Sequence, residues 1–524
     1  MIRSFLFVLF IFFSLNTHCQ EWIRIYGNGQ NPQVRYVIED YDKGYDILGM
    51  INNYKYLWLI KTSVNGNILW DRKIGNGIYT NWAGNIEKTL DGGYIICGTW
   101  TKFNPSYDAF IIKLNACAEV EWCKTLITPT NYDMGLRVKP TPEGDYVLLG
   151  AYFMTDPISN VSLFKFNPTG DLIWHQFYPM DSIYYDDQPQ DLVTDDGYLI
   201  SSARYYPDSG TVAPKIIRHY FVKTDTAGNQ IWELVYGANK HFYGWPWAAK
   251  KSMNGSYYEA GNHINVNGNG SPAFVKVLKN GVQSYHSDVL SGMYWGGLSS
   301  IDFLYDSLIV MVGGWTINDT THDVFFKTDT LGNVKKIKEL PRLSHSYWST
   351  AKTFDNKFIT VGMDAYNPTW KIYAVKVNSD LEYDSIYTKP FTYDSLCPHP
   401  IVSGTVDPVC NNVYVGIEEP FKNPETTKLK IFPNPASDHL TVEMPKYLVV
   451  SNTSGKIPST TIYHQWGSVL LEIYDLFGKK ILEKQVVRSE TLLEIDVSPW
   501  PAGIYLCRLT FNKQTVGSAK VVVE

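Results

Sequence analysis

The sequence predicts an all-β protein, in which a seven-bladed β-propeller is followed by a small C-terminal β-sandwich. Three observations predict this fold class. Aromatic residues, which favour strands, are abundant, with 37 Tyr, 24 Phe and 16 Trp among 524 residues. A strand pattern recurs seven times at intervals of about 50 residues. A separate alternating pattern of apolar residues follows near the C-terminus.

Residues 1–19 have the features of a signal peptide. Arg3 precedes an apolar run from Phe5 to Phe13, which is too short to span a bilayer and has the length of a signal-peptide core. We place the cleavage site near Cys19. In a lipoprotein Cys19 would be acylated, but His18 stands where lipoprotein signals have a small residue, so soluble export is favoured. No later segment is apolar for long enough to cross a membrane, and we expect no membrane span.

Residues 20–389 are expected to form the propeller. One strand of each repeat ends in a lysine, and these lysines lie 49 to 58 residues apart: Lys61, Lys113, Lys165, Lys223, Lys276, Lys327 and Lys376. The strand before it repeats in step, as in Gly44–Gly49, Gly93–Gly98 and Asp145–Gly150. A short apolar strand and a Trp strand complete a four-stranded unit. Four strands in about 50 residues is the size of a propeller blade, and stacking such units around an axis buries their apolar faces.

Two segments compete for the last place in the ring. Glu21–Gly27 matches the Trp strand that ends other repeats, so it can pair with the last blade and close the ring. Glu382–Ile386 fits the same place. The sequence leaves this choice open.

Recurring side chains of the repeat are interpreted as framework. Trp70, Trp174 and Trp232 follow glycine turns that resemble the tryptophan motifs of quinoprotein propellers, but no cofactor pocket accompanies them. We therefore expect packing tryptophans and no cofactor. The repeated lysines are expected to lay their stems on a neighbour and their ammonium groups in water. Acidic stretches such as Asp186-Asp187 lack the ligand spacing of a calcium loop, and we expect no metal site.

Residues 390–427 form a Pro-rich connector whose expected role is spacing. Cys397 and Cys410 bracket part of it, and Cys117 and Cys123 flank a predicted hairpin turn. In an oxidising compartment each close pair is expected to bridge locally, Cys117 with Cys123 and Cys397 with Cys410.

Residues 428–524 carry an ordered set of motifs at the C-terminus. They are Ile431–Ala436 with Asp438 and Leu440, then Ile473–Lys479, Pro501–Tyr505 and Lys520–Val523. Together they resemble the type IX secretion C-terminal sorting domain found in Bacteroidetes. The resemblance implies recognition by the type IX secretion machinery at the outer membrane, with release from the cell or attachment to its surface. A polar insertion, Pro445–Gly467, is interpreted as a surface loop.

No catalytic constellation is expected. The sequence has no metalloprotease His pair and no hydrolase nucleophile elbow, and a net charge of −6 without Lys and Arg clusters disfavours nucleic acid as a partner. Aromatic residues in the loops between repeats are the candidate ligand contacts, because rings with polar neighbours suit glycans and peptides. They are Tyr243, Trp245, Trp247, Tyr294, Trp295, Tyr347 and Trp348, with packing between blades as the alternative.

These observations predict a secreted or surface-displayed propeller that binds a macromolecule, glycan or protein, without catalysis. Two alternatives stay open. Two carboxylates from different blades could converge near the axis, which would make the protein a carbohydrate-active enzyme. Without a pocket or a ligand, it would be a structural component of a surface layer.

Overall fold

The computed structural model divides the chain into two compact units, Met1–Val415 and Gly416–Glu524. It describes residues 20–27, 29–101, 107–128, 133–155, 158–178, 186–206, 216–236, 244–264, 270–289, 295–317, 320–341, 345–364, 370–393, 396–415, 427–443, 469–476, 478–486, 492–511 and 514–524. The predicted signal peptide and the insertion 445–467 lie outside the described residues. Every regular element in these ranges is a strand, so the all-β prediction is confirmed. None of the described segments forms a helix long and apolar enough to cross a membrane.

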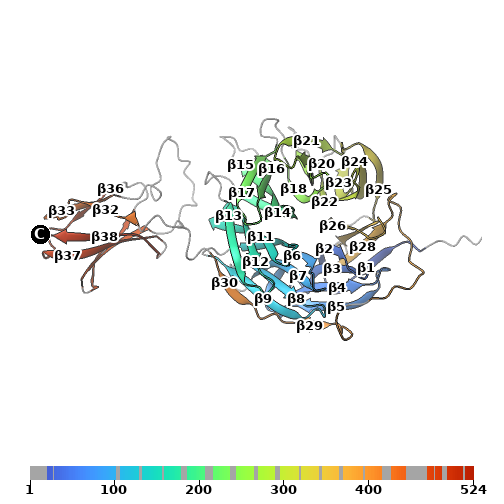
Figure 1. Ribbon diagram of the computed structural model, residues 1–524, viewed down its shortest axis with the longest axis horizontal. Coiled ribbons are helices and arrows are strands. Elements are labelled where there is room, and N and C mark those ends of the chain that lie inside the picture. Colours follow the sequence, from blue (N-terminus) through green and yellow to red (C-terminus); the bar gives the residue numbers. More distant parts are fainter. Residues whose placement is uncertain are drawn as a thin grey trace, which may run out of the picture. The chain divides into compact units, whose positions relative to one another are not determined.

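Consecutive antiparallel strands form each sheet of the first unit (Figure 1). Named I to VII, the sheets run as follows: I, β2 (Gln33–Glu39), β3 (Tyr45–Ile51), β4 (Tyr56–Thr62) and β5 (Ile68–Ile74); II, β6 (Thr80–Lys88), β7 (Tyr94–Thr101), β8 (Asp108–Leu114) and β9 (Val120–Ile127); III, β10 (Asp133–Pro140), β11 (Tyr146–Thr155), β12 (Ile158–Phe166) and β13 (Leu172–Tyr178); IV, β14 (Asp186–Thr194), β15 (Tyr198–Tyr206), β16 (Ile216–Thr224) and β17 (Gln230–Val235); V, β18 (Pro246–Lys251), β19 (Tyr257–Ile264), β20 (Gly270–Val277) and β21 (Gln283–Asp288); VI, β22 (Trp295–Tyr305), β23 (Leu308–Ile317), β24 (Thr320–Asp329) and β25 (Val334–Glu339); and VII, β26 (His345–Lys352), β27 (Phe358–Asp364), β28 (Lys371–Val377) and β1 (Ile23–Tyr26).

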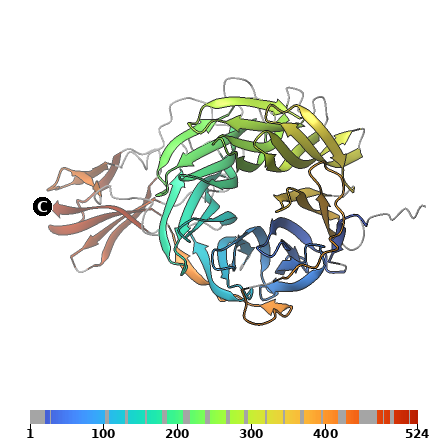
Figure 2. The ribbon, with the colours of Figure 1, turned by 45° about the vertical axis from the view of Figure 1, so that its right-hand side comes forward.

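The sheets form a closed ring. The first strand of each sheet contacts the first strand of the next, from β2 to β6 and onward to β26, which returns to β2. These strands lie nearest the axis and are called inner strands, and the remaining strands of each sheet lie outside them (Figure 2). Apolar side chains fill the space between neighbouring sheets, such as Leu48 of sheet I with Ile96 and Phe110 of sheet II. This is the arrangement of a β-propeller.

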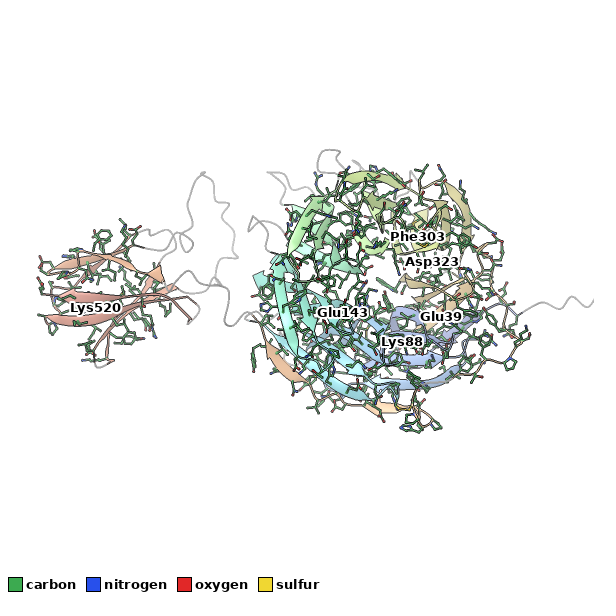
Figure 3. The ribbon with its side chains drawn as sticks, in the orientation of Figure 1. Glu39, Lys88, Glu143, Phe303, Asp323 and Lys520 are labelled. Carbon is green, nitrogen blue, oxygen red and sulfur yellow. A yellow bond between two sulfur atoms is a disulfide. The ribbon has the colours of Figure 1, made fainter. Side chains whose placement is uncertain are left out.

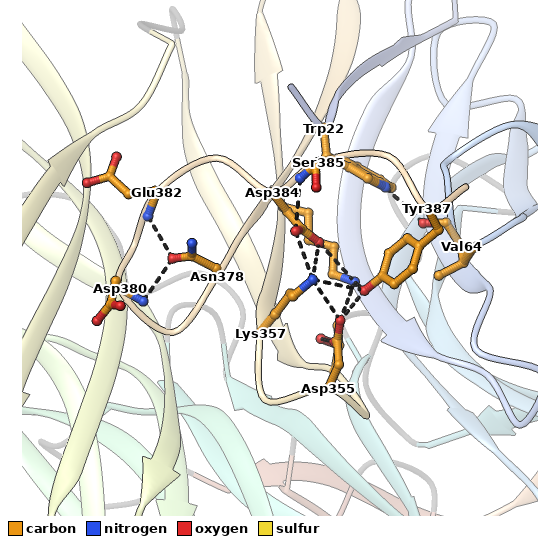
Figure 4. Close-up of polar contacts among 12 residues, drawn as sticks. Trp22, Val64, Asp355, Lys357, Asn378, Asp380, Glu382, Asp384, Ser385 and Tyr387 are labelled. Atoms are coloured by element: carbon orange, nitrogen blue, oxygen red, sulfur yellow. Dashed lines mark hydrogen bonds and ion pairs between the residues drawn. The ribbon is translucent and has the colours of Figure 1, made fainter. Parts of the chain in front are cut away.

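The N-terminal strand closes the ring, which answers the question that the sequence left open. Strand β1 pairs antiparallel with β28, with Ile23 opposite Val375. The Trp22 amide donates to the Asp384 carbonyl oxygen at 2.7 Å, so the segment Glu382–Ile386 runs beside Trp22 and contributes isolated bridges to sheet VII. Figure 4 shows Trp22 next to Asp384, with its indole directed at Val64 of sheet I.

A bulge in each inner strand explains the glycine that ends the second strand of the repeat. Every inner strand shifts register at this bulge, beside the residue paired with Gly49, Gly98, Gly150, Ser202, Gly261, Gly313 or Gly362. A Cβ atom at Gly49 would lie 2.1 Å from the Gln33 carbonyl oxygen, and one at Gly98 would lie 2.1 Å from that of Trp82. The inner strand therefore approaches too closely for a side chain at these positions.

The repeated lysines form buried ion pairs, so the expectation of ammonium groups in water is wrong for most of them. Lys61, Lys113, Lys223 and Lys376 are between 0 and 3% exposed. Each lies opposite the turn that joins the first two strands of its own sheet, and an acid of that turn pairs with it. The N–O distances are 2.7 Å for Lys61–Asp42 and Lys113–Asp91, 2.9 Å for Lys223–Asp196 and 3.5 Å for Lys376–Asp355.

The tryptophans of the outer strands pack between sheets, as expected. The Trp22, Trp122 and Trp232 indole N–H groups donate to carbonyl oxygens in the last turn of the next sheet, at 2.8, 2.9 and 3.3 Å. The glycine of that turn lies against the indole: a Cβ at Gly170 would be 2.7 Å from Trp122. Gly170 also has a φ of +83°, which L side chains rarely adopt.

The connector binds to the ring along residues 396–415, which corrects the expected spacing role for this part of it. Strand β29 (Gly404–Val406) adds in parallel to β5, and β30 (Asn411–Tyr414) adds in parallel to β9. These added strands cover the outer edges of sheets I and II, which would otherwise expose unpaired backbone groups. Residues 416–426 lie outside the described part of the chain.

The disulfides differ from the local bridges expected from sequence. Cys117 pairs with Cys397 and Cys123 pairs with Cys410, so both bridges join the connector to sheet II. The local pairing is wrong because the connector lies along β9, and this places each cysteine of sheet II beside a partner about 280 residues away in sequence.

The second unit consists of two sheets around a common core. One sheet has the order β31 (Thr427–Lys428), β38 (Gln514–Val523), β37 (Gly503–Phe511), β34 (Val469–Asp475) and β35 (Lys480–Val486). The other has β32 (Lys430–Phe432), β33 (His439–Glu443) and β36 (Leu492–Asp496). Leu440 and Ile495 from the smaller sheet pack with Leu471 and Val521 from the larger one. The Asn434 amide side chain joins the sheets by hydrogen bonds to the backbone of β38.

Candidate ligand-binding site

The seven predicted aromatic contacts differ in their burial and in their surroundings. Tyr243 and Tyr294 lie outside the described residues, and Trp295 is the first residue of β22. Tyr347 is fully buried, and its hydroxyl donates to the Pro341 carbonyl oxygen at 3.3 Å. The prediction is wrong for Tyr347, because this residue stands before the bulge of β26 and packs in the core between sheets VI and VII.

Three further predicted contacts, Trp245, Trp247 and Trp348, are half-buried. Trp245 meets Tyr205 edge-on, with ring centroids 5.3 Å apart. The Trp247 ring lies on Gly297 of the next inner strand, where a Cβ atom would be 2.2 Å from it. Trp247 thus packs between sheets V and VI, which is the alternative interpretation of these aromatics. Trp348 lies in a different setting, beside an arginine.

Arg35 occupies the bulge of β2, and its guanidinium group makes cation–π contacts with two indole rings. The Arg35 Cζ atom is 5.2 Å from the Trp82 ring centroid and 5.1 Å from that of Trp348. Three neighbouring inner strands, β26, β2 and β6, supply one of these side chains each. Tyr54 stacks on Trp82 with centroids 4.9 Å apart, and Gln33 donates a hydrogen bond to the Tyr54 hydroxyl. We refer to these five residues as the Arg35 cluster.

The other lysines and arginines of the inner strands have polar partners. At the end of β6, Lys88 lies next to β2, whose last residue is Glu39, and pairs with Asp40 at 2.9 Å (Figure 3). The remaining pairs are Lys139–Glu87, Arg137–Asp191 at 3.2 Å, Lys250–Asp302 at 3.7 Å, Lys251–Asp195, and Lys352 with the Leu304 carbonyl oxygen at 2.7 Å. The pKa of Lys250 is raised, chiefly by the Asp302 carboxylate, and Tyr36 and Glu87 act in the same direction. The inner strands that carry these residues lie nearest the axis of the ring (Figure 2).

Arg35 differs from these cations in having no acceptor. Its Nε atom is buried, and no described residue accepts a hydrogen bond from the group or forms an ion pair with it. Burial, the largest cause, lowers the pKa of Arg35, and the positive charge of Arg137 acts in the same direction. An arginine nevertheless keeps its proton at physiological pH. The site therefore holds one cation whose charge is compensated by no acidic side chain in the part of the chain that the structure describes.

Sequence reasoning missed Arg35, Trp82 and Tyr54. One signal was present: Arg35 and Trp348 each follow the residue that pairs with the repeated glycine, Gly49 in sheet I and Gly362 in sheet VII. Aligning the inner strands on that glycine brings the two bulged residues to equivalent positions. The bulge itself had to be known, because it changes which side chains share a face.

A buried polar group in sheets IV and V has the residue types of a catalytic triad without its geometry. Ser201, His219 and Glu259 are fully buried. Both Ser201 Oγ and His219 Nδ1 bond to the Glu259 carboxylate, so the serine is bonded to the acid and not to the imidazole. Burial raises the pKa of Glu259. Because an activated serine needs a hydrogen bond to its base, this arrangement is interpreted as packing between sheets.

A pocket of about 200 Å³ lies where the connector meets the ring. It is lined by Gly75, Asn76, Tyr79, Asn81, Trp100, Asp407, Pro408 and Cys410. In the wall of the pocket, the Asn81 side-chain amide donates hydrogen bonds to backbone carbonyl oxygens, among them that of Lys55 at 2.9 Å. Nearby, Cys117, Cys397 and His399 lie close enough to share a metal, but the two sulfur atoms are joined to each other and are not thiolate ligands.

The second unit identifies how the protein is secreted. Residues 430–524 match the family described as the secretion system C-terminal sorting domain. The resemblance drawn from sequence is confirmed. Such a domain indicates secretion to the cell surface or the extracellular space, and it implies interaction with the type IX secretion machinery.

Solved structures with similar architecture have low identity to this chain. An ulvan lyase of polysaccharide lyase family PL25, bound to -[GlcA(1-4)Rha3S]-, is 10% identical with a TM-score of 0.47, over 68% of this chain and 96% of its own. The β-propeller domain of the Trilobed protease from Pyrococcus furiosus is 10% identical with a TM-score of 0.40, over 69% and 100%. A protein from Cyanidioschyzon merolae is 9% identical with a TM-score of 0.41, over 67% and 98%. A search of curated proteins finds no match.

The sorting domain has an open pocket of about 660 Å³ on its larger sheet. Residues of the family motif contribute to it: it is lined by Tyr474, Asp475, Leu476, Gly478, Ile504, Tyr505, Leu506, Arg508 and Lys520. At its floor, Arg508 Nη2 lies 2.7 Å from Glu472 Oε2 and donates to the Tyr474 hydroxyl at 2.8 Å. These contacts hold the basic side of the pocket in place.

Proposed function

We propose that the first unit is a seven-bladed β-propeller that binds an extracellular macromolecule, glycan or protein, without catalysis. We propose further that the second unit is a β-sandwich that acts as the export signal of the protein. The observation that carries this proposal is the Arg35 cluster. Its two indole rings and its uncompensated cation lie on inner strands, where three sheets meet. Aromatic side chains with one polar group held between them are typical of recognition sites.

The domain boundaries form part of the proposal. A signal peptide at 1–19 starts export, and the mature chain begins near residue 20. The propeller spans 20–389, a disulfide-linked connector follows at 390–427, and the sorting domain occupies 428–524. The strand β1 supports the start of this range, because it is needed at the ring closure.

Three carboxylates of the inner strands favour binding over hydrolysis. Glu87, Asp191 and Asp302 each pair with a lysine or arginine of a neighbouring strand. A general acid in a glycosidase needs a raised pKa, whereas a neighbouring cation favours the ionised carboxylate. The arrangement supports a structural role for these acids.

A glycan and protein array with the full mature chain tests the proposal. We expect wild-type protein to bind at least one class of macromolecule and the Trp348→Ala variant to bind it about three- to tenfold more weakly, since aromatic contacts are worth about 0.5–1.5 kcal/mol each. Trp247→Ala is the matched control, because Trp247 occupies the equivalent bulge in sheet V. Hydrolysis of a polysaccharide that is lost in Asp191→Asn or Asp302→Asn would favour the enzyme instead. Binding to no member of either array would favour a surface-layer component.

A further inference from the structure

The stacking of Arg35 determines which part of the guanidinium group is left for a ligand. A planar guanidinium has two faces and an edge that carries its five N–H donors. The two indole rings of Trp82 and Trp348 lie about equally far from Arg35 Cζ, at 5.2 and 5.1 Å. A cation–π contact satisfies no N–H donor, and Arg35 Nε has no hydrogen-bond partner among the described residues. The donors of Arg35 are therefore available to the acceptor atoms of a ligand.

The charges around the axis make this acceptor an anion. Glu87, Asp191 and Asp302 are each matched by a cation of an inner strand. Arg35 is the cation in this part of the described structure without such a match. A buried, unpaired donor on a charged group is costly, and an oxyanion that accepts from two N–H groups at once offsets that cost most effectively.

We propose that the Arg35 cluster binds the carboxylate or sulfate group of an acidic polysaccharide. This inference rests on the proposed function and names its ligand class. A single uncompensated cation matches one anionic group on a sugar unit whose other groups are neutral hydroxyls. A nucleic acid is disfavoured because the chain has a net charge of −6 and the other lysines and arginines of the inner strands have partners. Half-buried indole rings on both sides of the arginine also suit the C–H faces of sugar rings.

Affinity electrophoresis and calorimetry of the full mature chain test the inference. The probes are polygalacturonate, alginate and hyaluronate, which carry carboxylates, and kappa-carrageenan, which carries sulfates. Each is run beside its carboxyl-reduced or desulfated form. We expect wild-type protein to bind at least one acidic polymer and to prefer it to its neutral form. Arg35→Gln is expected to weaken this binding about 10- to 100-fold, as for the loss of a charge-assisted hydrogen bond, and to abolish the preference. The two polymer groups distinguish carboxylate from sulfate recognition.

Two variants separate loss of recognition from loss of folding. Arg24→Gln is the matched control, because Arg24 also stacks on a tryptophan, with Cζ 5.3 Å from the Trp22 ring, but donates to the Asn65 carbonyl oxygen. Arg35→Met keeps the length and apolar stem of the side chain without its charge. Both are expected to unfold at wild-type temperature; Arg24→Gln binds as wild type and Arg35→Met does not.

The failures of the two proposals can be told apart. Equal affinity for acidic and neutral polymers, or an unchanged preference in Arg35→Gln, would overturn the anion site while leaving a glycan-binding propeller. Binding of poly-L-glutamate in place of every polysaccharide would overturn the ligand class. If the protein bound none of the polymers and no member of the glycan and protein arrays, the proposed function itself would be wrong.

Discussion

At the scale of single residues, the buried lysine of the first repeat and its acidic neighbours have altered pKa values. Lys61 lies among Asp40, Asp42 and Asp46, and the four side chains are nearly inaccessible to water. Burial by itself would raise the pKa of Asp40, but the ammonium groups of Lys61 and Lys88 outweigh this effect and lower the pKa to about 2. Asp46 lies 3.9 Å from Lys61 and is fully buried, and desolvation raises its pKa to about 7. One carboxyl of the group is therefore protonated in mildly acidic solution.

The Asp46→Asn variant tests this assignment through the pH dependence of stability. An unfolded Asp has a pKa of about 3.9, so the folded state holds a proton on Asp46 that the unfolded state has lost between about pH 4 and 7. The contribution of Asp46 is present below pH 4 and is lost as the pH rises to 7. We expect urea unfolding, followed by tryptophan fluorescence, to show a smaller decline across this window in Asp46→Asn than in wild type. The exposed Asp306→Asn is the control, and identical slopes in all three proteins would contradict the assignment.

At the scale of elements, strands that repeat could be predicted and strands that occur once could not. The lysine of each repeat and the glycine of six of the seven repeats mark two strands, because the buried ion pair favours the lysine and the close backbone approach favours the glycine. Strands β29 and β30 have no such mark, since their residues pair in parallel with strands more than 280 positions earlier in the chain. The Arg35 cluster likewise joins residues from sheets I, II and VII, and only ring closure brings these together.

The cysteine pairing is the element-scale prediction, because four cysteines allow three pairings and the path of the connector selects one. Cleavage after Glu119 or Glu121 separates Cys117 from Cys123, and cleavage before Asp407 separates Cys397 from Cys410. We expect mass spectrometry of the unreduced protein, digested in this way, to find Cys117 linked to Cys397 and Cys123 linked to Cys410. A link between Cys117 and Cys123 would contradict the position of the connector on sheet II.

At the scale of the whole molecule, the two units have separate cores and separate tasks. Apolar residues of the sorting domain, such as Leu471 and Val521, form one cluster, and the clusters of the ring contain residues of the first unit alone. The ring is also closed within the first unit by β1 and braced there by both disulfides. Each unit therefore has what it needs to fold without the other.

This separation makes export and folding independently testable in the native host. Deletion of residues 430–524 removes the sorting domain but none of the strands or cysteines of the ring. We expect the shortened protein to accumulate in the periplasm with both disulfides formed and with protease resistance equal to that of the exported propeller. Residues 428–524 fused to an unrelated signal-peptide-bearing reporter are expected to carry it to the surface, as judged by cell fractionation and immunoblotting. A shortened protein that is degraded, while the fused reporter reaches the surface, would contradict independent folding. The stability of the ring would then depend on the sorting domain as well as on its own core.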